Sequence, residues 1–83
     1  MVPRNGDALS AAVGDLLRDR ISDRGVSQEL VAAAAGMSQP TLSRCLSGKR
    51  SWDLDQLHAA CQFLGCVTSD LIAVAEDITG GTR

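Results

Sequence analysis

Residues 27–46 have the pattern of two short helices separated by a tight turn. The run QELVAAAA after Ser27 consists largely of strong helix formers, and the Ser27 hydroxyl can cap it by accepting the free amide of Glu29 or Leu30. Gly36 ends the run where a left-handed residue is commonly needed, so the chain can turn within about three residues into another helix. The sequence therefore predicts the sharp corner of a helix-turn-helix.

The second helix of this pair has a defined start and two different faces. Ser38 can cap it, and Pro40 falls in its first turn, where the missing amide has no intrahelical partner. Ser38 should therefore bond chiefly to the amide of Thr41. The residues expected to face inward are Leu42, Cys45 and Leu46. The residues expected to face outward are Gln39, Pro40, Ser43 and Arg44.

Apolar residues recur at helical spacing in the rest of the chain as well. The expected helices are 8–22, broken by Gly25, then 54–64, ended by Gly65, and a last helix capped by Thr68 or Ser69. Their predicted inward residues are Leu9, Val13, Leu16, Leu17, Ile21, Leu54, Leu57, Ala60, Cys61 and Leu64. The sequence thus predicts an all-α, compact five-helix domain over 8–75, with a polar lead-in at 1–7 and a frayed tail at 76–83.

Length and composition agree with one small helical domain. A chain of 83 residues supports a single core, and because its composition is 45% hydrophobic but only 2% aromatic, that core must use Ala, Leu, Val and Ile. No apolar run approaches the roughly 20 residues that span a bilayer, and the start of the chain lacks a secretory signal pattern. We therefore expect a cytoplasmic protein with no membrane association.

Charge is distributed unevenly along the chain. The net charge of −2 and the isoelectric point near 5.1 count against nucleic-acid binding, which depends on neutralising phosphates. However, residues 30–52 contain no acid and carry Arg44, Lys49 and Arg50, whereas residues 53–83 carry five acids and one arginine. The distribution indicates one basic and one acidic side, and the acidic side would be repelled from DNA.

Metal binding and catalysis find little support in the residue inventory. His58, Cys61 and Cys66 form an H-x2-C-x4-C cluster, but a metal would need a further ligand, so buried, reduced thiols are the expected state. The chain has one His and no Tyr, and it contains no HExxH, GxGxxG or complete phosphate loop. We expect no enzyme activity, metal or cofactor.

The run SQELVAAAAGMSQPTLSRCLSGKR resembles the helix-turn-helix of the Cro and lambda-repressor-like family of phage and bacterial regulators, also called the xenobiotic-response-element family. The resemblance continues through LDQLHAACQFLGCVTSDLI and covers roughly residues 8 to 75. It implies a transcriptional regulator, most simply a repressor in phage immunity or bacterial gene control, that reads a double-stranded DNA operator in the major groove. Small residues have a steric reason here: Ala32 lets the second helix cross closely, and Gly36 permits the reversal.

This resemblance implies particular DNA contacts. The expected base-contacting residues are Gln39, Pro40, Ser43 and Arg44. The expected phosphate-contacting residues are Gln28, Thr41, Ser47, Lys49 and Arg50. Glutamine suits adenine and arginine suits guanine in bidentate pairs, whereas proline offers only apolar contact.

Several alternatives stay open. The family commonly has an acidic or polar residue where Leu46 stands, so Leu46 is also expected to face a partner rather than water. The oligomeric state is also open, and the candidate contact for a homodimer is the last helix, with Leu71, Ile72 and Val74. Trp52 fits either a lid on the core or an interface. The competing function is a helical protein-interaction or antitoxin-like module that keeps this fold without reading DNA.

Overall fold

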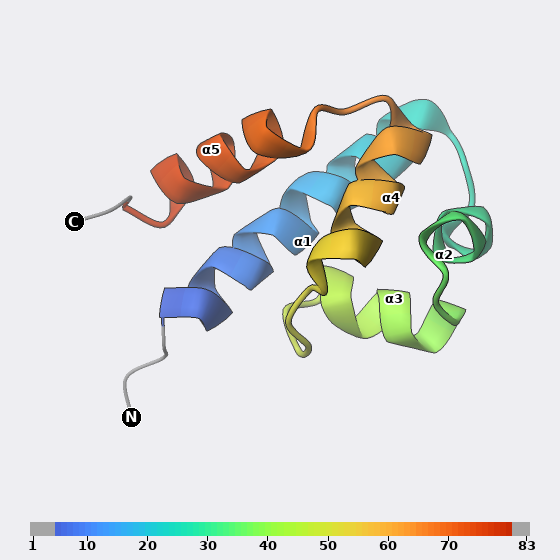
Figure 1. Cartoon of the computed structure of the whole chain (residues 1–83), viewed down its shortest axis with the longest axis horizontal. Helices are drawn as coiled ribbons and strands as arrows, with labels where there is room; N and C mark the ends of the chain where they lie inside the picture. Colours follow the sequence, from blue (N-terminus) through green and yellow to red (C-terminus); the bar gives the residue numbers. More distant parts are fainter. Residues whose placement is uncertain (1–4, 81–83) are drawn as a thin grey trace.

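Five α-helices make up the computed structural model, which describes residues 5–80 and contains no strand in that range. In chain order they are α1 (Asn5–Arg24), α2 (Gln28–Ala35), α3 (Gln39–Leu46), α4 (Leu54–Leu64) and α5 (Thr68–Ile78). Figure 1 shows α1 running through the middle of the molecule, with α3 at one edge and α5 on the opposite side. The predicted all-α, five-helix architecture is confirmed.

Helix boundaries differ from the expected ones mainly at the two ends of the chain. The first helix was expected over 8–22, but α1 begins at Asn5 and continues to Arg24, because nothing before Gly25, with φ of 67°, interrupts it. The last helix continues to Ile78, so residues 76–78 are helical rather than part of a tail. Residues 79 and 80 of the expected tail form a turn, and the remaining parts of the lead-in and tail, 1–4 and 81–83, lie outside the described residues.

Side-chain caps define the starts of α2, α3 and α4, and those of α2 and α4 are described first. Ser27 accepts from the amide of Leu30 at 3.1 Å, as predicted, and Asp53 accepts from the amides of Asp55 and Gln56 at 2.9 and 3.1 Å. These bonds satisfy amides that have no partner inside the helix.

The predicted cap of the last helix is wrong. Val67 occupies the N-cap position of α5 and no side chain caps it. The Thr68 hydroxyl lies one residue too late, inside the helix, and 2.9 Å from Nδ1 of His58 on α4. Its polar group is therefore engaged with a neighbouring helix instead of the start of its own.

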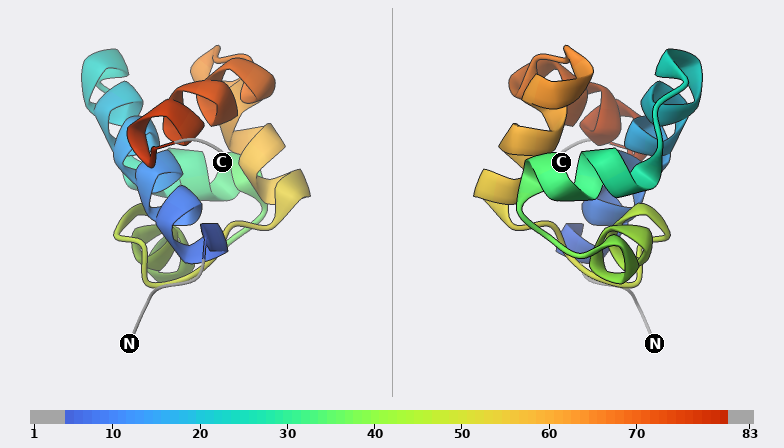
Figure 2. Two further views of the ribbon diagram at one scale, coloured as in Figure 1. Left: turned by 90° about the vertical axis from the view of Figure 1, so that its left-hand side faces the viewer. Right: turned by 90° about the vertical axis from the view of Figure 1, so that its right-hand side faces the viewer.

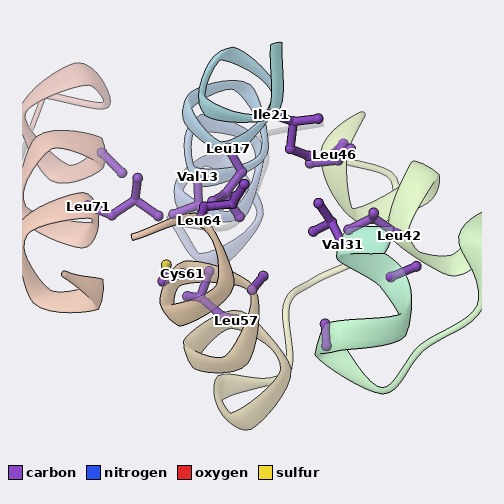
Figure 3. Close-up of a cluster of buried hydrophobic side chains, with 14 of the residues drawn as sticks. Val13, Leu17, Ile21, Val31, Leu42, Leu46, Leu57, Cys61, Leu64 and Leu71 are labelled. Atoms are coloured by element: carbon purple, nitrogen blue, oxygen red, sulfur yellow. The ribbon is translucent and has the colours of Figure 1, made fainter. Parts of the chain in front are cut away.

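A single core lies between the helices, and α1 supplies its central wall (Figure 3). Helix α1 packs against α3, α4 and α5, while α2 packs chiefly against α4 and α3. The two side views in Figure 2 show α4 and α5 closing one end and α3 standing at the other. The largest fully buried side chains are Leu17, Leu42, Leu46, Leu64, Val31, Cys45 and Cys61. Burying an aliphatic side chain of this size contributes about 1.5–3 kcal/mol, so these residues account for much of the driving force for folding.

Two leucines occupy environments other than those expected. Leu54, predicted to face inward, is 75% exposed because it stands at the first position of α4, where the helix extends past the core. Leu46, for which a partner-facing position was also expected, is 1% exposed and joins Ile21 in the core cluster drawn in Figure 3. Leu46 is therefore part of the domain interior.

Trp52 is a lid on the core. Its indole is partly buried against the hydrophobic cluster, and Nε1 is buried without a hydrogen-bond partner among residues 5–80. Trp52 therefore packs the loop of residues 47–53 against the core just before α4 begins.

Neither metal coordination nor a membrane-spanning helix emerges from the described part of the chain. No three His, Cys, Asp or Glu side chains within residues 5–80 are placed to hold a metal ion; Cys61 is buried and Cys66 is partly buried. No single described helix is long and apolar enough to cross a bilayer, and the pair α4 and α5, which would suffice by length and composition, is bent by 107°.

Candidate nucleic-acid interface

A glycine turn sets α3 steeply across α2. Gly36 has φ of 72° and ends α2; its amide bonds to the carbonyl of Ala33 at 3.2 Å, and the amide of Met37 bonds to that of Ala32 at 3.0 Å. This pair of bonds forms a Schellman turn, which needs a left-handed residue at the position of Gly36. Ala32 is buried, and α2 and α3 pack against each other. In Figure 1, α2 is viewed end-on while α3 lies across the view.

The start of α3 is built as predicted. The Ser38 hydroxyl accepts from the Thr41 amide at 3.3 Å. Pro40 stands in the first turn, where a backbone amide would have no intrahelical partner, so its missing N–H costs no hydrogen bond. The helix therefore begins sharply at Gln39, directly after the turn.

One side of α3 belongs to the core and the other to solvent. Leu42, Cys45 and Leu46 are no more than 1% exposed, as their predicted inward direction requires. The four residues expected to read bases, Gln39, Pro40, Ser43 and Arg44, are all exposed. At about 100° per residue these four occupy an arc of about 140° on one side of the helix. The structure thus brings all four together on one outward face.

The residues expected to contact phosphates flank this face but are not equally free. Lys49 and Arg50 are exposed in the loop after α3, and Gln28 is partly buried at the first position of α2. Thr41 is partly buried, and its hydroxyl accepts a bond from Ser38 at 2.9 Å. Ser47 donates its hydroxyl to the carbonyl of Arg44 at 3.1 Å, so it would have to release that bond before donating to a phosphate.

The charges around α3 are positive on its outer face and in the loop beyond it. Arg44, Lys49 and Arg50 lie in a stretch without acids, whereas Asp53 and Asp55 follow at the start of α4. The expected acidic side away from DNA therefore fits α5, the helix that lies opposite α3 in Figure 1, but not the start of α4. Asp53 accepts the amides of Asp55 and Gln56 at the start of α4, where the helix dipole favours a negative charge.

The buried side of α3 contains a thiol, Cys45, that is affected by the charge of Arg50 in the loop. Burial raises the pKa of the Cys45 thiol, and the positive charge of Arg50 partly opposes this effect. Cys45 is therefore a neutral core residue that contributes no charge to the outer face.

Sequence reasoning missed two residues of α1 that contact the end of α3. Gly14 lies against the carbonyls of Cys45 and Leu46, and Nη2 of Arg18 donates to the Leu46 carbonyl at 2.7 Å. A signal was present, because glycine inside a helix costs about 1 kcal/mol relative to alanine and commonly marks a close approach. The arginine gave no such signal.

A short helix that presents a polar, cationic face beyond a tight glycine turn defines a DNA-binding domain of the kind used by transcriptional regulators. The chain belongs to the helix-turn-helix domain family, whose model matches residues 12–74. Among solved structures, it is similar to the clp gene regulator ClgR from Corynebacterium glutamicum. One ClgR structure has 28% sequence identity and a TM-score of 0.80, over 87% of this chain and 77% of that one.

A second ClgR structure gives a concordant result. It also has 28% identity, with a TM-score of 0.75, over 84% of this chain and 91% of the other. No curated protein sequence matches the chain. The expected resemblance to helix-turn-helix regulators is confirmed.

Proposed function

We propose that this protein is a sequence-specific regulator of transcription that inserts α3 into the major groove of a double-stranded operator. The observation that carries the proposal is the outer face of α3, where four exposed side chains, among them one cation and no acid, project from a helix whose other side is buried. The major groove of B-DNA admits one α-helix and displays a distinct pattern for each base pair.

The side chains of this face differ in what they offer a base edge. Gln39 at the start of α3 can pair with adenine and Arg44 with guanine, each good pair discriminating by about 1–3 kcal/mol. Ser43 offers a hydroxyl donor or acceptor, and Pro40 an apolar surface for a thymine methyl group. In this proposal Gln39 and Arg44 determine most of the sequence preference.

Phosphate contacts come from both ends of the motif. Lys49 and Arg50 would neutralise phosphates beyond the end of α3, and Gln28 would hold the backbone from the start of α2, with Thr41 and Ser47 between them. These contacts fix the position of the protein on the duplex and carry no sequence information directly. They also make binding sensitive to salt.

We propose further that two copies bind together through α5. Val67, directly before α5, and Val74 and Ile78 on α5 are 60%, 47% and 59% exposed and recur at helical spacing with the buried Leu71. Because Leu71 and the partly buried Ile72 are used in the core, the contact residues differ from the expected set, of which only Val74 remains. A symmetric pair would match half-sites about 34–36 Å apart.

The regulatory outcome proposed is repression of bacterial or phage genes in the cytoplasm. A domain bound to an operator prevents other proteins from binding the same DNA. Repression of this kind needs only the DNA-binding surface. The similarity to ClgR, described as a clp gene regulator, supports a regulatory role on DNA.

Selection of bound duplexes from a random pool tests the proposal. Wild type should enrich one motif, and a Gln39→Ala, Arg44→Ala double variant with an unchanged circular dichroism spectrum should enrich none or a degenerate one. If folded wild type enriches no sequence at low salt, the proposal is wrong. The protein-interaction module, which needs no base readout, would then be the better description.

A further inference from the structure

We propose that one face of α1, made by Ala11, Gly14 and Arg18, is a seat that fixes the end of α3 and thereby sets how its outer face meets a base pair. These residues recur at spacings of three and four and so share one side of α1. The inference rests on the proposed DNA-reading function and adds to it a positioning role for residues that project no side chain toward DNA.

The backbone at the end of α3 lies close against α1. A Cβ at Gly14 would lie 2.6 Å from the carbonyl oxygens of both Cys45 and Leu46, so no larger residue fits without a backbone shift. Ala11, one turn before Gly14 on α1, lies against the loop after α3: a Cβ at Gly48 would be 3.0 Å from the Ala11 Cβ. The end of α3 and the loop after it therefore rest directly on α1.

Arg18 completes the hydrogen bonding of the end of α3. The last four carbonyls of a helix lack intrahelical partners, and here three accept backbone amides: Ser43 from Ser47, Arg44 from Lys49, and Cys45 from Gly48. The fourth, on Leu46, accepts Nη2 of Arg18 at 2.7 Å.

The guanidinium of Arg18 is itself held in place. Its Nη1 lies 3.3 Å from Oδ1 of Asp15, one turn earlier on α1. Its positive charge faces the negative end of the α3 dipole.

This seat matters for readout because it fixes the end of α3 that the glycine turn does not reach. The turn at Gly36 and the Ser38 cap fix the start of α3, and the seat fixes its end. A helix of eight residues is only about 12 Å long, so a small displacement of one end re-aims every outward side chain. Bidentate base contacts depend on such angles, whereas contacts from flexible lysines to phosphates adapt to them.

The test compares Arg18→Ala and Arg18→Lys with the control Arg20→Ala. Arg20 carries the same charge on α1 as Arg18, but it lines the groove beside α5 instead of contacting α3. Affinity is measured for the selected duplex and for an unrelated duplex. Arg18→Ala should lower the ratio of the two affinities about fivefold or more, whereas Arg18→Lys, which can still donate to the Leu46 carbonyl, and Arg20→Ala should keep it near wild type.

Other outcomes overturn the proposal in recognisable ways. An equal loss of affinity for both duplexes, with a salt slope lower by about 0.9, would make Arg18 a phosphate ligand instead. A lower Tm with an unchanged affinity ratio would make it a purely structural residue.

A measurement without DNA separates this inference from the proposed function. Amide hydrogen exchange at Ser47, Gly48 and Lys49 should be faster in Arg18→Ala than in Arg20→Ala, while α2 exchanges alike in both variants. Unchanged exchange at these amides would overturn the seat even if the wild type reads DNA. Faster exchange in a protein that enriches no DNA would support the seat while rejecting the operator proposal.

Discussion

The Ser38 hydroxyl and Thr41 form a reciprocal pair, in which Ser38 accepts the Thr41 amide at 3.3 Å and donates to the Thr41 hydroxyl at 2.9 Å. The arrangement leaves the Thr41 proton available to an external acceptor. It therefore links the stability of α3 to the orientation of one of its proposed phosphate ligands.

Ser38→Ala should destabilise the domain by about 1 kcal/mol, the usual cost of losing an N-cap. For a domain of this size that corresponds to a Tm lower by about 4–8 °C. Thermal unfolding followed by circular dichroism measures it. Ser43→Ala, which removes a hydroxyl from the exposed middle of the same helix, should change stability by less than about 0.5 kcal/mol; an equal effect would contradict the cap.

Arg44→Ala and Lys49→Ala should separate base readout from phosphate binding. Arg44→Ala should relax preference at one base position, at a cost of about 1–3 kcal/mol for the preferred duplex. Lys49→Ala should weaken binding to all duplexes alike and lower the salt slope by about 0.9. Fluorescence anisotropy titrations with matched duplexes at several salt concentrations distinguish the two. A uniform loss for Arg44→Ala would remove it from the base-reading set.

Leu46→Ala should lower the free energy of unfolding by about 2–5 kcal/mol, because it removes a fully buried side chain and leaves a cavity. Leu54→Ala makes the same chemical change at a position that is 75% exposed, and its effect should stay within about 0.5 kcal/mol. Urea unfolding monitored by the single tryptophan, Trp52, compares them. Similar costs for both variants would contradict the assignment of Leu46 to the core.

Val74→Asp should weaken self-association about tenfold if α5 is the dimer contact, because a charge would be buried in an apolar interface. Ala73→Asp adds the same charge at the neighbouring exposed position of α5 and should have a smaller effect. Sedimentation equilibrium with and without a palindromic duplex gives both association constants. A wild type that stays monomeric on such a duplex would exclude the proposed pair.

The three thiols should differ in how fast they react with a thiol reagent. Cys45 and Cys61 are fully buried and should react with a thiol reagent only during unfolding, whereas the partly buried Cys66 should react first. Mass spectrometry of the labelled peptides gives the order. Rapid labelling of Cys45 would contradict its burial beneath α3.

The sign of the pH effect follows from burial, which raises the pKa of Cys45 and Cys61 above the ordinary value of 9.0. The two neutral thiols contribute their full stability well below pH 9, where they are ionised in neither the folded nor the unfolded chain. It is lost as the pH rises through the folded-state pKa values, because the unfolded chain ionises first. A Cys45→Ala, Cys61→Ala variant should show a flatter decline of stability above pH 9 than wild type.

The parts of the fold that the sequence predicted are those specified by nearby residues. The cap at Ser38, the reversal at Gly36 and the outward arc of α3 each depend on neighbours within one or two turns. The bond from Arg18 to the Leu46 carbonyl instead joins two helices through residues 28 apart in the chain. No local pattern specifies such a contact, and the cap of α5 failed for the same reason, because Thr68 is engaged by His58.

The division of α3 into a buried and an exposed side has a consequence for how such a protein can change. Leu42, Cys45 and Leu46 are tied to the fold, so substitution there risks the whole domain. The outward positions are not constrained by the core, so Gln39, Ser43 and Arg44 can be substituted with little effect on stability. Substitutions at these three positions therefore provide a route to new DNA targets without a change of fold.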